Sequence, residues 1–516
     1  MSGKNQQEVF DFLADPATHG GKEVKRLRTH VAEVFLVGDC AYKVKRAVCY
    51  AFLDFSTLDA RRRACEAEVR LNRRTAPDIY LGLSVIRRKA AGELELDHRG
   101  NGAGEPLEWA VRMRRFDESQ TLDLLADEGR LVAPLIDSLV DAIVGLHEEA
   151  EVRGQPYGGA EGLRAIVEEN RADMTRFPVV FSPDRLASLI SVQQKALSQN
   201  AALLDARREA GFVRRCHGDL HLGNVVLWQE KPTPFDCIEF SESIGTIDVA
   251  YDLSFLLMDL EVRGLRALAN RAMGRYFGRM SHPEILSALP LMLALRASVR
   301  AKVSAMTAEG ASDERARQRA LKAAHSFFAA AEAFMSDASA PRLIVVGGLS
   351  GSGKTTLAAA LAPDVGRVPG ALHLRSDIVR KRLAGVAPEE RLPVEAYDKG
   401  SSRRVYETLF REAHAALKAG QVVVLDAVFA RPDERAEAEA LARDTQVRFD
   451  GLWLDAPADA LKARVSARKG DASDATAQVV EQQLTYAIGE IAWPRIDATQ
   501  REESVMQEAQ GYLKLA

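Results

Sequence analysis

Two groups of polar residues have the types and spacing that phosphoryl-transfer chemistry needs. The first is Gly348-Leu-Ser-Gly-Ser-Gly353-Lys354-Thr355, which fits G-x-x-x-x-G-K-S/T in full. A strand-like apolar run precedes it and a helix-like run follows, so backbone N–H groups can surround phosphate oxygens at a helix N-terminus. We expect Lys354 to reach the β- and γ-phosphates and Thr355 to bind Mg²⁺. The predicted nucleotide-binding residues are Gly348, Ser350, Gly351, Ser352, Gly353, Lys354, Thr355 and Thr356.

Acidic and basic residues further along suit the same reaction. Asp426 ends the apolar run Val422–Leu425 and could hold Mg²⁺. Asp377 follows another strand-like run, where a carboxylate can accept the proton of an acceptor hydroxyl or simply cap a helix. Arg380 lies one helical turn later and could bind an anionic substrate.

Three basic residues near the C-terminus precede a loop rich in Gly, Asp and Ser. Arg464 and Arg468 are spaced i, i+4, and Lys469 follows. This pattern suits a lid whose guanidinium groups stabilise the transferring phosphoryl, although a solvated helix face has the same pattern. We predict catalytic roles for Arg464 and Arg468.

Residues 342–516 resemble the small P-loop kinases typified by gluconate kinase, zeta-toxin and polynucleotide 5′-kinase. The resemblance rests on the phosphate loop, the D-x-x-R pattern of Asp377 and Arg380, the strand aspartate Asp426 and the basic lid. It implies that Asp377 activates the acceptor hydroxyl and that ATP and Mg²⁺ are required.

The second group is Cys216-His-Gly-Asp219-Leu-His-Leu-Gly-Asn224, which has the H-x-D-x-x-x-x-N spacing of a kinase catalytic loop. Asp219 would accept the acceptor proton and Asn224 would bind Mg²⁺. A later carboxylate must complete the metal site. Asp236 is the first choice and Glu239 the alternative, on an expected strand from Pro234 to Phe240.

An upstream lysine and a helix glutamate complete the N-terminal set. Lys43 in Cys40–Lys45 has the setting of the lysine that contacts the α- and β-phosphates, and Lys45 is the alternative. Glu68 on the expected helix Leu58–Thr75 is preferred over Glu66 as the partner of this lysine.

Residues 30–335 resemble the aminoglycoside-phosphotransferase-like branch of the protein-kinase fold. The H-G-D-x-H-x-x-N form and Asp252, which we expect to order the catalytic loop, carry this resemblance. It implies a small-molecule kinase. The chain departs from the kinase pattern because no G-x-G-x-x-G precedes Lys43.

Hydrophobic periodicity separates the regions that must position these residues. The resemblance to the kinase fold implies that residues 1–335 form a bilobal, protein-kinase-like α+β domain, with lobes at about 22–118 and 119–335. Residues 336–341 read as a linker. Alternating strand and helix patterns over 342–516 predict an α/β P-loop domain with a parallel sheet.

Composition narrows the class of protein. The 516 residues carry 69 Lys and Arg against 73 Asp and Glu, a net charge of -4 that gives no global signature of nucleic-acid binding. Five cysteines without C-x-x-C spacing favour a reducing, cytoplasmic setting, and no apolar run is long enough to cross a bilayer.

The sequence therefore favours a bifunctional ATP-dependent phosphotransferase with one ATP and Mg²⁺ site per domain, acting on hydroxyl groups of small, sugar- or nucleoside-like molecules. One alternative is a single active P-loop kinase with a regulatory or degenerate N-terminal domain. Another is a nucleic-acid 5′-end kinase.

Overall fold

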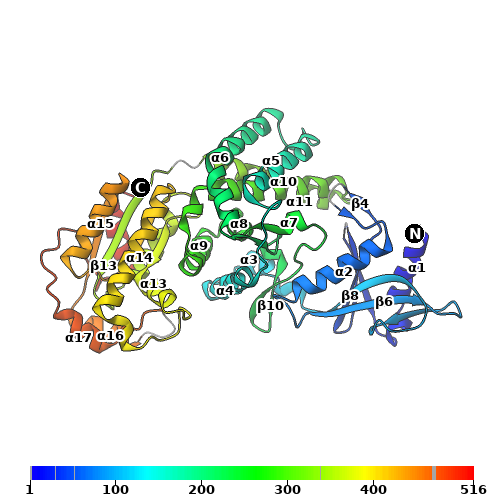
Figure 1. Cartoon of the computed structure of the whole chain (residues 1–516), viewed down its shortest axis with the longest axis horizontal. Coiled ribbons are helices and arrows are strands. Elements are labelled where there is room, and N and C mark those ends of the chain that lie inside the picture. The colour runs from blue at the N-terminus through cyan, green and yellow to red at the C-terminus, as the bar shows by residue number, and fades with distance from the viewer. Residues whose placement is uncertain (1–2, 30, 51–52, 337–338, 468–471, 516) are drawn as a thin grey trace. The chain divides into compact units, whose positions relative to one another are not determined.

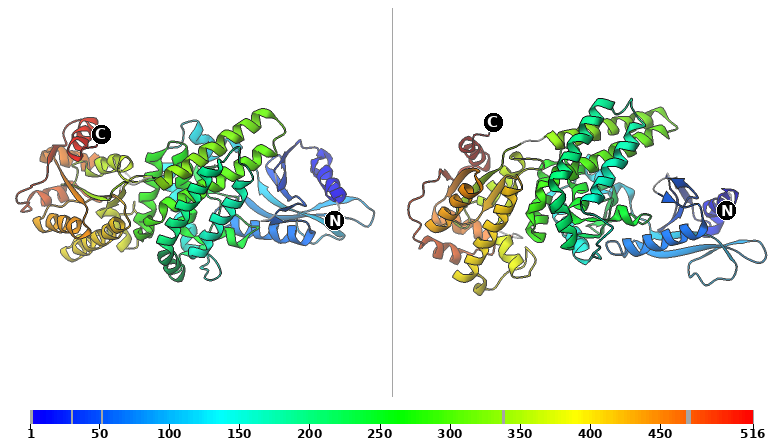
Figure 2. Two further views of the ribbon diagram at one scale, coloured as in Figure 1. Left: turned by 90° about the horizontal axis from the view of Figure 1, so that it is seen from above. Right: turned by 45° about the horizontal axis from the view of Figure 1, so that its top comes forward.

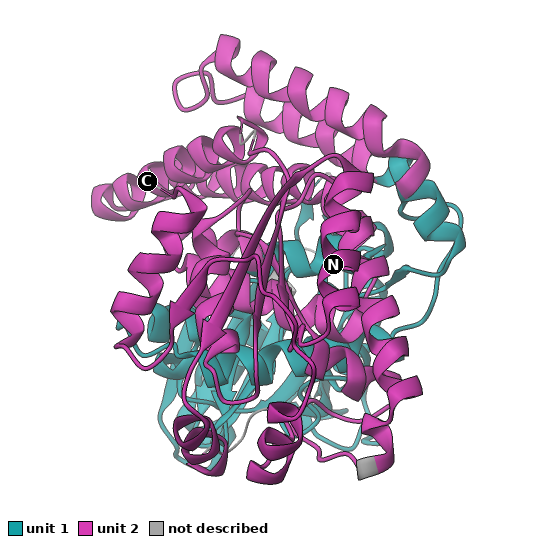
Figure 3. Cartoon of the chain, turned by 90° about the vertical axis from the view of Figure 1, so that its left-hand side faces the viewer, with its two compact units in different colours: residues 1–162, 204–256 teal, residues 163–203, 257–516 magenta. Residues whose placement is uncertain are grey.

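The computed structural model describes residues 3–29, 31–50, 53–336, 339–467 and 472–515. The chain divides into two compact units, one of residues 1–162 with 204–256 and one of residues 163–203 with 257–516 (Figure 3). The unit boundaries fall inside three helices, α5 (Gly159–Thr175), α6 (Pro183–Glu209) and α8 (Val249–Val262).

The first unit begins with a six-stranded antiparallel sheet in the order β1-β2-β3-β8-β6-β7. Its strands are β1 Val24–Arg28, β2 Ala32–Val37, β3 Cys40–Lys45, β6 Tyr80–Arg88, β7 Leu94–Asp97 and β8 Glu105–Arg114. A two-stranded insertion, β4 (Cys49–Tyr50) and β5 (Leu53–Asp54), follows β3.

Two helices cover opposite faces of this sheet (Figures 1 and 2). Helix α1 (Gly3–Ala14) packs Phe10 against Phe35 on one face. Helix α2 (Leu58–Asn72) packs Cys65 against the other face, which also carries Ala41. Because side chains alternate along a strand, the same face receives Lys43 and Lys45.

The rest of the first unit is built around the catalytic-loop residues. Its helices are α3 Leu122–Asp127, α4 Ala133–Glu149, α7 Glu242–Gly245 and the beginning of α8. Its strands form two antiparallel pairs: β9 Val213–Arg215 with β12 Thr246–Asp248, and β10 Val225–Trp228 with β11 Lys231–Pro234. The loop from 216 to 224 therefore runs between β9 and β10.

The second unit combines long helices with a parallel sheet. The helices include α9 Arg266–Met280, α10 Leu289–Glu309 and α11 Glu314–Ser336. The sheet has five parallel strands in the order β14-β15-β13-β16-β17, with bounds β13 Arg342–Gly348, β14 Leu372–Arg375, β15 Val423–Asp426, β16 Arg448–Asp455 and β17 Arg495–Asp497. The predicted α/β fold with a parallel sheet is confirmed.

Helices enclose this sheet on both faces (Figure 1). On one face α12 (Lys354–Leu361) and α18 (Glu502–Leu513) bury Leu357 and Ala509 against Ile344. On the other, α14 (Lys399–Lys418) and α15 (Pro432–Thr445) pack onto the strands. The remaining helices are α13 Ser376–Leu383, α16 Ala458–Ala467 and α17 Ala477–Leu484.

The edge strand β14 is covered by α9 within the same unit. Asn270 donates a hydrogen bond to the carbonyl of Ala371 at 2.9 Å, just before the strand. On α13, Arg382 donates to the carbonyl of Gly278 at 2.8 Å. A helix over the edge blocks pairing with further strands.

The predicted elements at both candidate sites are present, with one error. The expected strand from Pro234 to Phe240 ends at Pro234, because Asp236 adopts a left-handed backbone with φ of 61° and the chain turns inward. None of the helices in the described ranges is both long and apolar enough to span a membrane.

Candidate active sites

The catalytic-loop aspartate and asparagine lie together in the first unit. Asn224 donates from Nδ2 to Asp219 Oδ2 at 2.8 Å and to the Asp219 carbonyl at 2.9 Å. The preceding Gly218 has φ of 89°, and a Cβ there would come within 3.0 Å of Ile238. Glycine therefore lets the loop pass close to the segment that carries Asp236.

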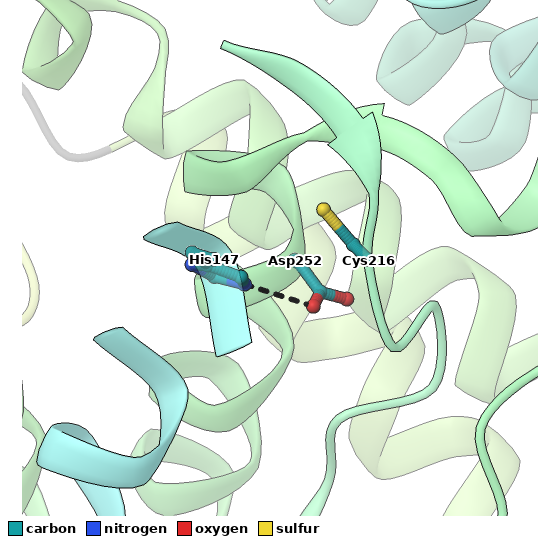
Figure 4. A group of neighbouring side chains, drawn as sticks. All are labelled: His147, Cys216 and Asp252. Carbon is teal, nitrogen blue, oxygen red and sulfur yellow. Dashed lines mark hydrogen bonds and ion pairs between the residues drawn. The ribbon is translucent and has the colours of Figure 1, made fainter. Parts of the chain in front are cut away.

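Buried groups fix the backbone of this loop from behind. Asp252 accepts hydrogen bonds from the backbone N–H of His217 at 3.1 Å and of Gly218 at 2.8 Å. His147 lies 3.1 Å from the same carboxylate, and the Cys216 thiol is nearby (Figure 4). Both oxygens of Asp252 contact the loop, so the predicted ordering role of Asp252 is confirmed.

The imidazole of His217 links the loop to the metal-binding segment. Its Nε2 lies 2.9 Å from the carbonyl of Phe235, and its Nδ1 accepts from the N–H of Asp219 at 3.4 Å. Burial lowers the pKa of His217, so the neutral ring with a proton on Nε2 satisfies both contacts. This residue connects Asp219 to the residue before Asp236.

Five charged side chains form a cluster of ion pairs in the first unit: Lys43, Lys45, Glu68, Asp236 and Glu239. Lys43 Nζ lies 2.9 Å from Glu68 Oε1 and 2.5 Å from Asp236 Oδ1. Lys45 Nζ lies 2.5 Å from Glu68 Oε2 and also pairs with Glu239. The preferred residues Lys43, Glu68 and Asp236 are thus in direct contact, whereas Glu66 pairs at 3.0 Å with Arg62 on an exposed helix face.

Mutual attraction stabilises the charged forms of Lys43 and Asp236 despite their burial. Burial lowers the pKa of Lys43, but the carboxylates of Asp236 and Glu68 outweigh it and hold that pKa well above its ordinary value. Burial raises the pKa of Asp236, and Lys43 more than reverses this. Glu239 differs, because burial raises its pKa and the attraction of Lys45 offsets this only in part.

The oxygen-rich part of the cluster fits Mg²⁺, which prefers carboxylate and carbonyl oxygens. Asp236 offers a carboxylate with 42% side-chain exposure, and Asn224 offers an amide oxygen beside Asp219. The same sheet face also carries a buried apolar cluster that includes Ala41, Met113 and Val226, with Leu27 and Val34 packed against it.

The glycine-rich loop of the second unit joins β13 to α12. Gly351 has φ of 85°, and a Cβ there would lie 2.5 Å from the carbonyl of Leu461. The loop serines Ser350 and Ser352 are buried, Thr355 is half-buried at the start of α12, and Thr356 is exposed. The N–H of Ser350 donates to Gln483 Oε1 on α17 at 2.8 Å.

Asp426 lies at the carboxyl edge of the sheet, in register with Val346 of β13 and Arg375 of β14. Its side chain is 3% exposed, with His373 Nε2 at 3.4 Å and Arg375 Nε at 3.7 Å. Burial raises the pKa of Asp426, but His373, Lys354 and Arg375 outweigh it and hold the pKa at about 2. Asp426 is therefore an ionised carboxylate next to the phosphate-loop lysine, as a Mg²⁺ ligand must be.

The D-x-x-R residues begin α13, directly after β14. Asp377 is in the first turn of this helix, and Arg380 donates to the carbonyl of Ala396 at 2.7 Å. The guanidinium of Arg380 lies 4.7 Å from the centre of the Tyr397 ring. The Tyr397 hydroxyl donates to Asp474 at 2.6 Å. Through Arg380 and Tyr397, helix α13 is therefore linked to the segment after α16.

The structure describes only one of the two arginines that the sequence predicts for the lid. Arg464 lies on α16 and donates to the carbonyls of Ala498 at 2.6 Å and Gly351 at 3.4 Å. It therefore contacts the phosphate loop itself. Arg468 and Lys469 lie outside the described residues.

Sequence reasoning missed Gln483 and the group formed by Lys381, Tyr397 and Asp474. Lys381 Nζ lies 2.6 Å from Asp474 Oδ2, and its side chain is almost fully buried. None of these residues belongs to a local sequence motif. Only the folded chain shows that Gln483 contacts the phosphate loop and that Tyr397 and Asp474 lie next to helix α13.

Two family models match separate segments of the chain, and the first of these segments includes residues of both compact units. The model of a phosphotransferase enzyme family matches residues 88–289, and the model of an AAA domain matches residues 343–487. The uncharacterized protein Rv2004c of Mycobacterium tuberculosis is 31% identical over 496 residues, which cover 93% of each chain.

Two solved structures are each similar to part of the chain. A sugar kinase from Janibacter sp. is 23% identical, with a TM-score of 0.27, and covers 34% of this chain and 96% of its own. A choline/ethanolamine kinase family protein from Mesorhizobium loti is 17% identical, with a TM-score of 0.40, and covers 65% of this chain and 96% of its own.

Proposed function

The chain is a kinase of the same family as its mycobacterial relative, with a phosphotransferase-family domain followed by a P-loop domain, and we propose that it is bifunctional. Each domain would transfer a phosphoryl group from ATP to a hydroxyl of a small, sugar- or nucleoside-like molecule. The observation that supports the proposal is that each unit contains a lysine near a carboxylate and a further aspartate. These are Lys43, Asp236 and Asp219 in the first unit and Lys354, Asp426 and Asp377 in the second.

At the N-terminal site, Lys43 would leave Asp236 to bind the phosphates, while Glu68 keeps its ammonium in place. Asn224 and Asp236 would hold Mg²⁺, which neutralises phosphate charge when it is bound. Asp219, fixed by Asn224 at 2.8 Å, would aim the acceptor oxygen and take its proton.

At the C-terminal site, the phosphate loop would hold the nucleotide through backbone N–H groups and Lys354. Thr355 and Asp426 would hold Mg²⁺, since a hydroxyl and an ionised carboxylate are suitable oxygen ligands. Asp377 would orient the acceptor hydroxyl, Arg380 would bind an anionic part of that substrate, and Arg464 and Arg468 would stabilise the transferred group.

The function is tested by incubating the full chain with Mg·ATP and a pooled metabolite extract, followed by mass spectrometry of phosphorylated products. We expect Asp219→Asn and Lys354→Ala to lose different products or different phosphate positions. Products that persist in the double variant Asp219→Asn, Asp377→Asn would contradict both assignments.

A second candidate is a single active P-loop kinase with a regulatory N-terminal domain. It is favoured by the lack of a glycine-rich loop, because the connection between β1 and β2 contains no glycine. In this case Asp219→Asn would leave every product unchanged, while loss of nucleotide binding in the first unit would alter the turnover of the second.

A further inference from the structure

The N-terminal site contains a second buried lysine that the proposed chemistry does not use. Lys45 follows Lys43 by two residues on β3, so both side chains point to the same face of the sheet. Lys45 is 1% exposed and pairs with Glu68 Oε2 at 2.5 Å and with Glu239. Glu68 therefore contacts a different lysine with each of its two oxygens.

The two lysines differ in what can reach them. Lys43 pairs with Asp236, whose side chain is 42% exposed, whereas the Glu239 side chain beside Lys45 is 6% exposed. Because the Asp236 side chain is partly exposed, a metal ion or a phosphate can approach the Lys43–Asp236 pair from solvent. Lys45 and Glu239 have no such access, because an incoming ligand would have to enter a buried site.

An apolar cover closes the inner pair from solvent. The ring of Phe55 lies 5.6 Å from Lys45 Nζ, and Phe55 is 2% exposed. Phe55 belongs to an apolar cluster of Leu53, Phe55 and Ala64, with Val31, Val48 and Phe240 packed against them. Phe55 therefore contributes to the burial of Lys45.

The segment that ends at Glu239 has no regular secondary structure and depends on individual contacts. The N–H of Asp236 donates to the Tyr80 hydroxyl at 3.1 Å, and the N–H of Cys237 donates to Asn72 Oδ1 at 2.8 Å. The Glu239 side chain adds a contact to β3 itself. This contact joins the end of the metal-binding segment to the strand that carries Lys43.

We propose that Lys45 and Glu239 are positioning residues of the N-terminal site, which fix Glu68 and the segment 236–239 so that Lys43 and Asp236 meet metal and phosphate in the right geometry. The inference rests on the proposed N-terminal ATP site. Because this lobe has no glycine-rich loop, we expect the buried Lys45–Glu239 pair to hold Glu68 and residues 236–239 in place around the nucleotide.

The test uses the full chain carrying Lys354→Ala, which removes nucleotide binding at the P-loop, and measures binding of a fluorescent ATP analogue across a Mg²⁺ titration. Partners that orient metal ligands typically contribute about 10–100-fold in metal affinity. We therefore expect Glu239→Gln and Lys45→Met each to raise the required Mg²⁺ concentration at least about tenfold. Lys25→Met on exposed β1 is the matched control and should change nothing.

A double variant separates positioning from folding. Lys45→Met with Glu239→Gln removes one positive and one negative charge, and Glu68 keeps Lys43 as its ion-pair partner. We expect its melting temperature to recover relative to Lys45→Met alone, while its Mg²⁺ requirement stays raised. Recovery of wild-type Mg²⁺ dependence in the double variant, or unchanged binding in Glu239→Gln, would overturn the proposal.

A further variant distinguishes positioning from direct metal binding. Asp236→Asn should abolish Mg²⁺-dependent binding of the ATP analogue, because Asp236 is the solvent-accessible carboxylate assigned to the metal. If Asp236→Asn is tolerated and Glu239→Gln abolishes the dependence, Glu239 is itself the ligand and the positioning role is wrong. No nucleotide binding by the Lys354→Ala parent would overturn the N-terminal ATP site, and this inference with it.

Discussion

The two candidate sites differ in which groups of the chain form them. The C-terminal site uses backbone groups of one continuous loop, in which Gly351 approaches the carbonyl of Leu461 so closely that a side chain could not fit. The N-terminal site uses side chains from distant parts of the chain, with Lys43 and Asp236 separated by 193 residues and 2.5 Å apart. One site is specified locally and the other by tertiary packing.

This difference predicts how each site should respond to change. A backbone-built site depends on loop conformation and on the few groups that touch the loop, such as Gln483 and Arg464. A side-chain-built site depends on buried charge pairs, where loss of one partner leaves the other uncompensated. The substitutions below test whether the sites are separate and whether they fail in these different ways.

The largest effect is expected for Asp219→Asn. Loss of the proton-accepting carboxylate should lower N-terminal transfer by about 10²–10⁴-fold, the usual contribution of a general base. Nucleotide binding should persist, because Lys43, Glu68 and Asp236 are unchanged. Single-turnover transfer and fluorescent-nucleotide binding measure the two properties. Equal losses of both would show that Asp219 supports the fold rather than the chemistry.

Lys354→Ala should lower C-terminal transfer by at least about 10²–10³-fold, because it removes one preorganised electrostatic donor and, with it, nucleotide binding at the P-loop. Lys418→Ala, an exposed lysine at the end of α14, is the control. Assays of products specific to each domain should show the N-terminal product unchanged. A matching fall in that product would mean that the two sites are coupled.

Gln483→Ala should weaken nucleotide binding at the P-loop by about tenfold, since a buried N–H left without its partner costs about 1–3 kcal/mol. The affected donor is the N–H of Ser350, and the N-terminal site should be unaffected. The neighbouring Gln482→Ala, on the exposed side of the same helix, should bind as the wild type does. Equal effects of the two changes would exclude a specific role for Gln483.

The smallest effect concerns pH. The pKa of Asp426 is about 2 in the fold against an ordinary 3.8, so its ionised form stabilises the nucleotide-free chain above about pH 4. This contribution, about 2 kcal/mol, is lost as pH falls from 4 to 2. Acid unfolding of the wild type and Asp426→Asn should therefore converge as the pH decreases. A constant difference between them would contradict the assigned ion pairs.

Local motifs predicted much of both sites. The phosphate loop and the strand aspartate Asp426 could be located because each follows an apolar strand, and the catalytic loop because Asp219 and Asn224 have a fixed spacing. In the fold these two residues share a hydrogen bond, and Asp426 lies beside the phosphate-loop lysine.

What the sequence could not decide was which of two similar residues faces the site. Glu66 and Glu68 lie on one helix, and only the packing of α2 on the sheet turns Glu68 inward. The expected strand through Asp236 was wrong, because backbone contacts with Tyr80 and Asn72 bend this segment. Both contacts join residues more than 150 positions apart in sequence, which no local pattern encodes.

The most direct test of two separate sites is the number of nucleotides bound per chain, measured by calorimetry with Mg²⁺ and a non-hydrolysable ATP analogue. We expect two for the wild type, one for Lys354→Ala, one for Asp236→Asn and none for the double variant. One nucleotide bound by the wild type, or loss of both by either single variant, would contradict the account.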